Sequence, residues 1–195
     1  MAEGAFIFRP HCGTIVAMTR DRNATGKPPF DADALERAAL FYAGRYATTR
    51  AKLAAYLRRK LRERGWDGLD APDVDGLVQR MAGFGYVDDR AFAAAKATAL
   101  GRRGMGPRRV ELALRVAGIE EADAGEARSL AAEGAWSAAL RLAERRRIGP
   151  FADTQGDFEH RQKALAAMLR AGHAVDIARR IVAAPPGEIP SPDSG

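Results

Sequence analysis

Asp88 and Asp89 are the neighbouring side chains that most resemble a catalytic acid pair in this chain. They follow the run 83–87, Gly-Phe-Gly-Tyr-Val, whose glycines can adopt the positive φ that ends a helix. An aspartate at the start of the next helix accepts a hydrogen bond from a free backbone amide. Because adjacent side chains diverge at a helix start, we interpret both carboxylates as structural residues and not as an acid–base site.

Three further features invite a catalytic or ligand-binding interpretation, and none supports it. The pattern Gly-x-x-Gly-x-Gly at 101–106 resembles a phosphate loop, but no predicted strand precedes it and no Gly-Lys-Ser/Thr follows it. His11 and Cys12 are adjacent, yet a structural zinc site needs about four ligands, and the sequence has no second ligand pair. His160 and His173 lack the partner spacing of nucleophilic catalysis. The sequence predicts a protein that is not an enzyme and has no metal or cofactor.

Basic side chains gather in three clusters near predicted helix ends. The first cluster is Arg58, Arg59, Lys60, Arg62 and Arg64. It lies in the segment 45–64, which holds eight basic residues against one acidic residue, Glu63. A second cluster surrounds the glycines at 101–106, and a third, at 145–147, follows Glu144. Arginine suits phosphate contacts because its planar fork donates hydrogen bonds in pairs. The residues that we predict to contact an anionic partner are Arg50, Lys52, Arg58, Arg59, Lys60, Arg102, Arg103, Arg108, Arg109 and Arg115.

The overall charge agrees with an anionic partner. The chain has a formal net charge of +6 and a pI of about 9.9, a balance that favours polyanions or acidic proteins. Its single cysteine excludes an intramolecular disulfide and suits a reducing compartment. No signal peptide and no long apolar run is found, so we predict a cytoplasmic protein that does not enter a membrane.

The elements that position these residues are predicted to be helices only. The composition is rich in alanine and arginine, and no stretch shows sustained alternation of β-branched residues. Leu53, Leu57 and Leu61 recur every four residues, as on one face of a helix. Predicted helix starts are Asp31 or Asp33, Thr48 or Thr49, and Asp70 with Asp73 as a partial capping box. Six later helices are predicted near 88–103, 107–117, 120–133, 135–147, 157–171 and 174–183.

These helices form three rounds of three at a spacing of about 50 residues, a period typical of a repeat protein. The second helix of each round ends at a glycine, Gly65, Gly118 or Gly172. Units this small bury little alone, so we predict a tandem, elongated array. The predicted division is a flexible extension at 1–31, three-helix repeats at 32–85, 86–133 and 134–184, and a disordered tail at 185–195. The predicted cores include Leu57, Leu61, Phe84, Tyr86, Phe92, Val110 and Leu114.

Three pieces of the sequence resemble the RecX family, regulators of the RecA recombinase. They are the run 45–53 (RYATTRAKL), the run 85–93 (GYVDDRAFA) and the run 106–110 (GPRRV) with its closing Gly118-Ile119. The resemblance extends from about Asp33 to Ala183, and its most specific part is the turn at 85–93 followed by the helix that begins at 106. His173 and the two residues after it depart from the family, which usually has an aromatic and a small polar residue there.

The resemblance implies tandem three-helix units in a curved molecule that docks in the groove of the RecA–single-stranded DNA filament. It also implies a modulator, usually an inhibitor, that limits filament extension and lowers RecA activities in recombination and the SOS response. We expect a monomer that binds free DNA weakly and without sequence preference. The alternative is a helix-turn-helix transcriptional regulator, because pairs of short helices are also found there. Base reading favours Asn, Gln and Arg on an exposed helix. The three second helices offer arginine, but Gln162 is their only Asn or Gln.

Overall fold

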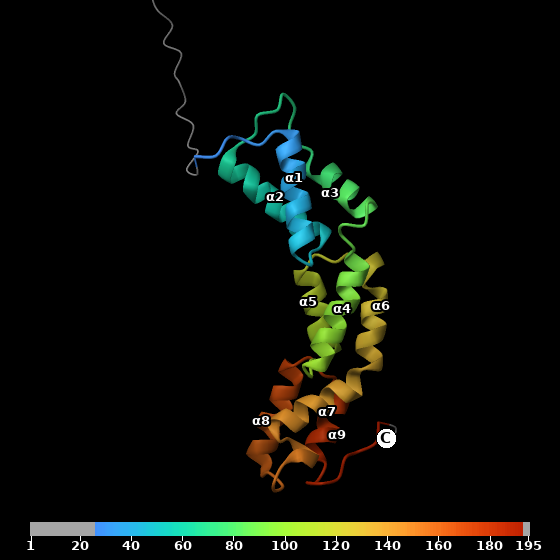
Figure 1. The fold of residues 1–195 in the computed structure, drawn as a ribbon. Helices are drawn as coiled ribbons and strands as arrows, with labels where there is room; N and C mark the ends of the chain where they lie inside the picture. Colours follow the sequence, from blue (N-terminus) through green and yellow to red (C-terminus); the bar gives the residue numbers. More distant parts are fainter. Residues whose placement is uncertain (1–25, 193–195) are drawn as a thin grey trace, which may run out of the picture.

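The computed structural model describes residues 26–192, and in this range the protein is all-α, as predicted (Figure 1). The only β-type pairing among the described residues is an isolated bridge between Phe30 and Trp66. The helices are α1 (Ala32–Arg45), α2 (Arg50–Arg64), α3 (Val74–Gly83), α4 (Asp89–Arg102), α5 (Pro107–Val116), α6 (Glu121–Glu133), α7 (Ala135–Arg146), α8 (Phe158–Arg170) and α9 (Val175–Ala183), with a 3-10 turn, η1 (Gly149–Phe151), after α7.

Side-chain caps begin several of these helices where the sequence indicated. Asp31 caps α1, Thr49 caps α2 and Asp88 caps α4, each by accepting a hydrogen bond from a backbone amide of the first turn. The predicted start of the third helix at Asp70 is wrong. Asp73 caps α3, while the carbonyl of Asp70 accepts a hydrogen bond from the Trp66 indole at 2.6 Å and holds the preceding loop.

Buried apolar side chains form three separate clusters, one for each successive group of three helices. The first, in α1–α3, contains large side chains such as Leu53, Leu57 and Met81. It also includes Phe30, which is 3% exposed, so the folded region begins before residue 32. The second, in α4–α6, consists mainly of alanines with Val110 and Leu114. We call these groups of helices unit 1, unit 2 and unit 3, and their boundaries remain a prediction.

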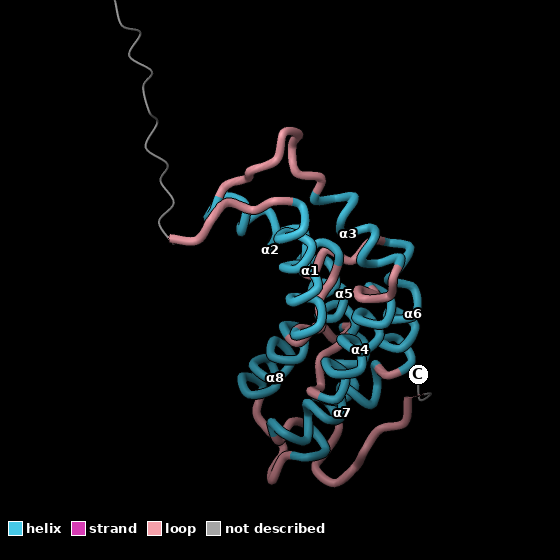
Figure 2. The backbone as a smooth tube through the Cα atoms, turned by 45° about the horizontal axis from the view of Figure 1, so that its top comes forward, coloured by secondary structure: helices cyan, strands magenta, loops and turns pink. Residues whose placement is uncertain are grey.

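The second helices of the three units meet end to end and give the molecule its length (Figures 1 and 2). Oγ1 of Thr49, at the start of α2, donates to the carbonyl of Ala117 at the end of α5 over 2.7 Å. The amide of Gly106, at the start of α5, donates to the carbonyl of Ala171 at the end of α8 over 2.9 Å. The closing glycines lie in the left-handed region, with φ of 83° at Gly65, 71° at Gly118 and 92° at Gly172.

One prediction about the buried residues is wrong. Phe84 and Tyr86 were predicted to be core residues, but they are 70% and 53% exposed. The turn before α4 enters the core of unit 1 only through Val87, which is 5% exposed, and the rings of Phe84 and Tyr86 remain outside it. On α4, Ala91 and Ala95 are exposed, whereas Ala93 and Ala97 are buried against the alanines of α6.

The last described residues lie against unit 3. The amide of Gly187 donates to the carbonyl of Pro150 over 2.8 Å, and Nη1 of Arg180 donates to the carbonyl of Pro192 over 2.9 Å. Residues 193–195 of the predicted tail and residues 1–25 of the predicted extension, with His11 and Cys12, lie outside the described range.

Candidate functional site

Four exposed arginines surround the connection between α4 and α5. Arg102 and Arg103 lie at the end of α4, and Arg108 and Arg109 lie in the first turn of α5. The chain between these two pairs packs directly against the backbone of unit 3, because a Cβ at Gly106 would lie 2.4 Å from the carbonyl oxygen of Gly172. The joint between units 2 and 3 therefore fixes the backbone from which these arginines project.

Helix α7 adds two more arginines at this joint. Nε of Arg141 donates to the carbonyl of Gly101 over 3.2 Å, and Nη2 of Arg145 donates to the carbonyl of Arg103. Both cations lie at the carboxyl end of α4, where the helix dipole favours positive charge. The structure thus brings together the second and third basic clusters, which are about 40 residues apart in sequence. We call the set Arg102, Arg103, Arg108, Arg109, Arg141 and Arg145 the joint arginine cluster.

The first four members of the joint arginine cluster make no ion pair with any residue between 26 and 192. Glu144 is exposed on α7 beside Arg145 and is the acidic residue nearest to the cluster in sequence. An arginine without a carboxylate partner keeps its donors for phosphate or for an acidic protein surface. This surface can therefore bind an anion without first breaking an ion pair.

Arg50, a predicted contact residue, is occupied within the fold. Its Nε lies 3.2 Å from Oδ2 of Asp89, and its Nη2 lies 2.5 Å from Oδ2 of Asp123 and 3.5 Å from Glu120. The hydrogen bond with Asp89 is the largest of the effects that raise the pKa of Arg50. Asp89 is buried, and Oδ1 of the same carboxylate accepts from the Arg50 amide over 2.9 Å. This network connects unit 1 to unit 2.

The predicted contact residues of the first basic cluster, Arg58, Arg59 and Lys60, also have partners. Nη2 of Arg58 donates to both carboxylate oxygens of Asp75, over 2.6 and 2.7 Å. Arg59 and Lys60 both pair with Glu63, over 3.6 and 2.7 Å, and the hydrogen bond from Lys60 is the main cause that lowers the pKa of Glu63. The pair of Arg58 with Asp75 is exposed to solvent and the pairs of Glu63 are partly exposed, so each is weak and can exchange for another anion.

Lys52 and Arg115 differ from these pairs. The Lys52 ammonium lies 4.6 Å from the ring centroid of Phe92 and makes a cation–π contact between units 1 and 2. Arg115 is exposed on α5, near Glu111. That carboxylate is bound by Nε and Nη2 of Arg128 over 2.8 and 3.0 Å, and this pairing is the main cause that lowers the pKa of Glu111.

His173 is a buried residue of the same joint that the sequence did not single out as a contact. Its Nε2 lies 3.0 Å from the carbonyl oxygen of Gly104, while no residue between 26 and 192 makes a hydrogen bond with its Nδ1. Burial lowers the pKa of His173, and the hydrogen bond to Gly104 opposes this effect only in part. The only feature of the sequence that drew attention to His173 was its departure from the RecX pattern.

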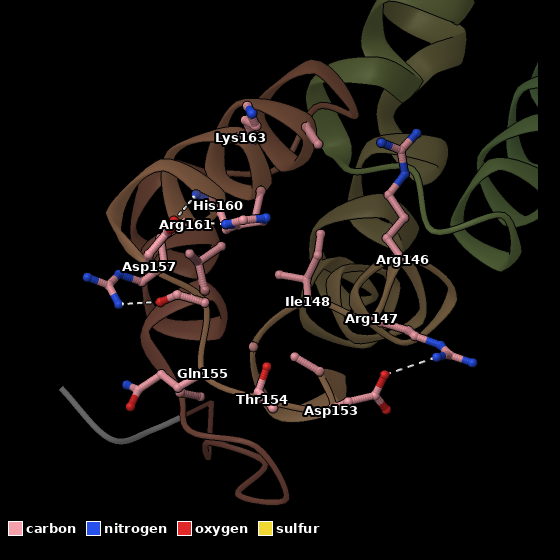
Figure 3. Close-up of a pocket in the computed structure, with 17 residues that line it drawn as sticks. Arg146, Arg147, Ile148, Asp153, Thr154, Gln155, Asp157, His160, Arg161 and Lys163 are labelled. Carbon is pink, nitrogen blue, oxygen red and sulfur yellow. Dashed lines mark hydrogen bonds and ion pairs between the residues drawn. The ribbon is translucent and has the colours of Figure 1, made fainter.

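A hollow of about 680 Å³ lies in unit 3 between the end of α7, the following loop and the start of α8 (Figure 3). Its basic residues are largely paired: Arg147 with Asp153 over 3.1 Å, Lys163 with Glu159 over 2.6 Å, and His160 with Asp157 over 2.8 Å. Nη1 of Arg161 donates to the carbonyl of Gly156 over 2.7 Å. Arg146 projects from the opposite side and is the one basic residue of this lining for which the described residues provide no partner.

The hollow is poorly equipped for catalysis. His160 and Asp157 could orient each other as a base and its partner, but Thr154 is the only hydroxyl side chain in the lining and makes no hydrogen bond to His160. Within residues 26–192, no three His, Cys, Asp or Glu side chains are grouped in a way that could hold a metal ion. None of the described helices is long and apolar enough to cross a lipid bilayer.

Comparison with known proteins identifies relatives named RecX. The sequence is 33% identical over 156 residues to a regulatory protein RecX from Myxococcus xanthus (strain DK1622). The aligned residues are 76% of this chain and 83% of that protein. A crystal structure of RecX from Lactobacillus salivarius superposes with a TM-score of 0.55 at 20% identity, over 77% of this chain and 93% of that one. A second crystal structure of a regulatory protein RecX superposes with a TM-score of 0.53 at 23% identity, over 76% of this chain and 72% of that one. No protein-family model matches the chain.

Proposed function

Because the chain belongs to the RecX family, we propose that it binds the filament of RecA on single-stranded DNA and inhibits its activities in recombination and the SOS response. In this proposal the protein acts in the cytoplasm as a monomer and contacts free DNA weakly. Two observations agree with this role: the relative from Myxococcus is named a regulatory protein, and the molecule is elongated (Figure 1). An elongated shape suits contact with several successive subunits of a filament.

The joint arginine cluster is the observation that carries this proposal. Arg102, Arg103, Arg108 and Arg109 are exposed, close in space and without carboxylate partners among the described residues. A paired cation of α2, such as Arg58 with Asp75, must break its ion pair before it contacts a new anion. The cluster makes new contacts without that loss, so we infer that it supplies most of the binding energy toward phosphate or an acidic protein groove.

The test is RecA-catalysed ATP hydrolysis on single-stranded DNA, followed as the purified protein is added. We expect inhibition at amounts stoichiometric with RecA. Replacing both Arg108 and Arg109 with Gln should weaken the inhibition at least tenfold, since a hydrogen bond to a charged group contributes about 1.5–3 kcal/mol.

The matched control is Arg58→Gln with Arg59→Gln, which removes the same charge from residues that already have partners. This control should inhibit nearly as well as the unchanged protein. If the unchanged protein leaves ATP hydrolysis unaffected, the proposed function is wrong. If the two double variants lose inhibition equally, only the assignment to the joint arginine cluster is wrong. Selective tight binding to one duplex sequence, with RecA unaffected, would instead support the helix-turn-helix regulator.

A further inference from the structure

A groove of about 610 Å³ lies between the α1–α2 connection and the first turns of α4, at the seam of units 1 and 2. Tyr46 and Thr48 line it from the connection, and Tyr86 lines it from the turn before α4. Phe92 and Lys96 line it from α4 itself. The groove contains none of the residues of the joint arginine cluster.

The groove exposes two aromatic rings, each of which packs against a neighbouring ring. Tyr46 is 51% exposed and Tyr86 is 53% exposed. The Tyr46 ring lies against Tyr42, with the centroids 5.2 Å apart, and Tyr42 stacks on Tyr56 at 4.1 Å. The Tyr86 ring meets Phe84 edge to face at 6.4 Å. A ligand that stacks on these rings orders few side chains that are not already ordered, so little conformational entropy is lost.

Positive charge accompanies the rings. The Arg45 guanidinium lies 5.9 Å from the Tyr46 centroid, the Lys52 ammonium lies against Phe92, and Lys96 lines the groove. The single carboxylate of the lining, Asp88, accepts a hydrogen bond from the Ala91 amide over 2.8 Å and is used as the cap of α4. The groove is therefore complementary to an anion.

The rest of the lining is unsuited to an amphipathic helix. It consists of alanines, glycines and polar residues, and it contains no Leu, Ile, Val or Met to receive the large apolar anchors of a helical peptide. This lining therefore does not favour a helical peptide as the occupant of the groove.

The geometry points to a binding site for single-stranded nucleic acid, in which bases stack on Tyr46 and Tyr86 while Arg45, Lys52 and Lys96 hold the phosphates. Exposed aromatic rings beside cations are the means by which proteins bind single strands without reading their sequence. This site uses different residues from the joint arginine cluster. The proposal of this site does not depend on whether the protein affects RecA.

The experiment measures binding of a fluorescently labelled oligothymidylate to the full chain by anisotropy, with an abasic sugar-phosphate strand of the same length as a second probe. Tyr46→Ala and Tyr86→Ala should each lower the affinity for oligothymidylate about tenfold, because stacking of one base contributes about 1–3 kcal/mol. Tyr46→Phe and Tyr86→Phe keep the ring and should stay within about twofold of the unchanged protein. The abasic strand should bind weakly, and equally to all five proteins.

Three outcomes would overturn this site. Equal affinity of the alanine variants and the unchanged protein for oligothymidylate would show that no base stacks there. An equal loss of affinity for the abasic strand would show that the rings support only phosphate contacts. A loss of RecA inhibition with unchanged oligothymidylate affinity would identify the groove as a protein-docking surface.

Discussion

At the scale of single residues, partners distinguish arginines that hold the fold together from arginines that are free to bind. Arg50 and Arg108 both stand near the start of a second helix, one in α2 and the other in α5. Arg50 contacts three carboxylates of unit 2, whereas Arg108 is exposed without one among the described residues. The same type of side chain thus joins two units in one place and is available to a partner in the other.

Removing the carboxylate of Asp89 should destabilise the joint between units 1 and 2. We expect Asp89→Ala to lower the free energy of unfolding by about 3 kcal/mol, because the partly buried Arg50 loses its closest buried partner and its amide loses an acceptor. Urea unfolding followed by circular dichroism measures this change. Asp75→Ala, which breaks an exposed pair with Arg58, is the control and should cost at most about 1 kcal/mol. Similar losses in both variants would contradict a structural role for Asp89.

His173 should make the joint between units 2 and 3 sensitive to acid. Burial lowers its pKa in the folded protein below the usual 6.5, so the unfolded chain binds a proton more readily. Stability therefore does not depend on this group at neutral pH, and it falls as the pH drops below about 6.5 toward the lower pKa of the folded state.

Urea unfolding of the unchanged protein and of His173→Gln, each at pH values of about 7.5 and 5.5, tests this prediction. The unchanged protein should lose more stability on acidification than the variant, which has no titrating group at this position. The exposed His160 provides the control. His160→Gln should lose as much stability on acidification as the unchanged protein does. If the unchanged protein and His173→Gln lose equal stability, the buried histidine is not the source.

At the scale of the helices, the second helix of each unit both carries the charged residues and connects the array. The start of α5 contacts the end of α8, and the end of α5 contacts the start of α2. These contacts are short because glycine occupies the closest positions. A Cβ at Gly106 would meet the Gly172 carbonyl oxygen at 2.4 Å, and one at Gly118 would meet the Ala51 Cβ at 2.3 Å. The spacing of the helices along the molecule thus depends on the absence of a side chain at two joints.

Two glycine substitutions only five residues apart should therefore have opposite effects. Gly106→Ala places a methyl group against backbone and should destabilise the protein by about 1–3 kcal/mol. Gly101 lies inside α4 with nothing within 4 Å of a built Cβ, so Gly101→Ala should stabilise by about 0.5–1 kcal/mol through helix propensity. Thermal unfolding of both variants provides the comparison. A stable Gly106→Ala would mean that the joint can open without cost.

The sequence predicted those elements whose local signals are unambiguous. Leucines every four residues indicated the buried face of α2, and an aspartate or threonine marked the starts of α1, α2 and α4. The buried face of α4 could not be predicted, because alanine occurs on both its buried and its exposed sides. The basic clusters were visible in the sequence, and so was the local spacing of Glu63 from Arg59 and Lys60. The distant ion pairs were not, because Asp89 is 39 residues from Arg50 and Asp75 is 17 residues from Arg58.

At the scale of the whole molecule, stability and binding both depend on how firmly three small cores are joined. Each unit has its own apolar cluster, and the joints combine backbone hydrogen bonds with side-chain contacts, among them the Thr49 hydroxyl, the buried His173 and the ion-pair network of Arg50. In such an array the total stability is roughly the sum of the units and of the contacts between neighbours. Weakening a joint should therefore separate the units in unfolding before it disrupts any single core.

The two tryptophans of the chain allow this coupling to be measured, because Trp66 packs on the core of unit 1 and Trp136 packs on the core of unit 3. Variants with a single tryptophan, Trp66→Phe and Trp136→Phe, each report one end of the molecule by fluorescence. In the otherwise unchanged protein, the two probes should give the same urea midpoint, since the joints couple the units. With Gly106→Ala added, the midpoints should separate, because the joint between units 2 and 3 no longer links the two ends. Midpoints that stay equal would show that the coupling does not pass through the contact between Gly106 and Gly172.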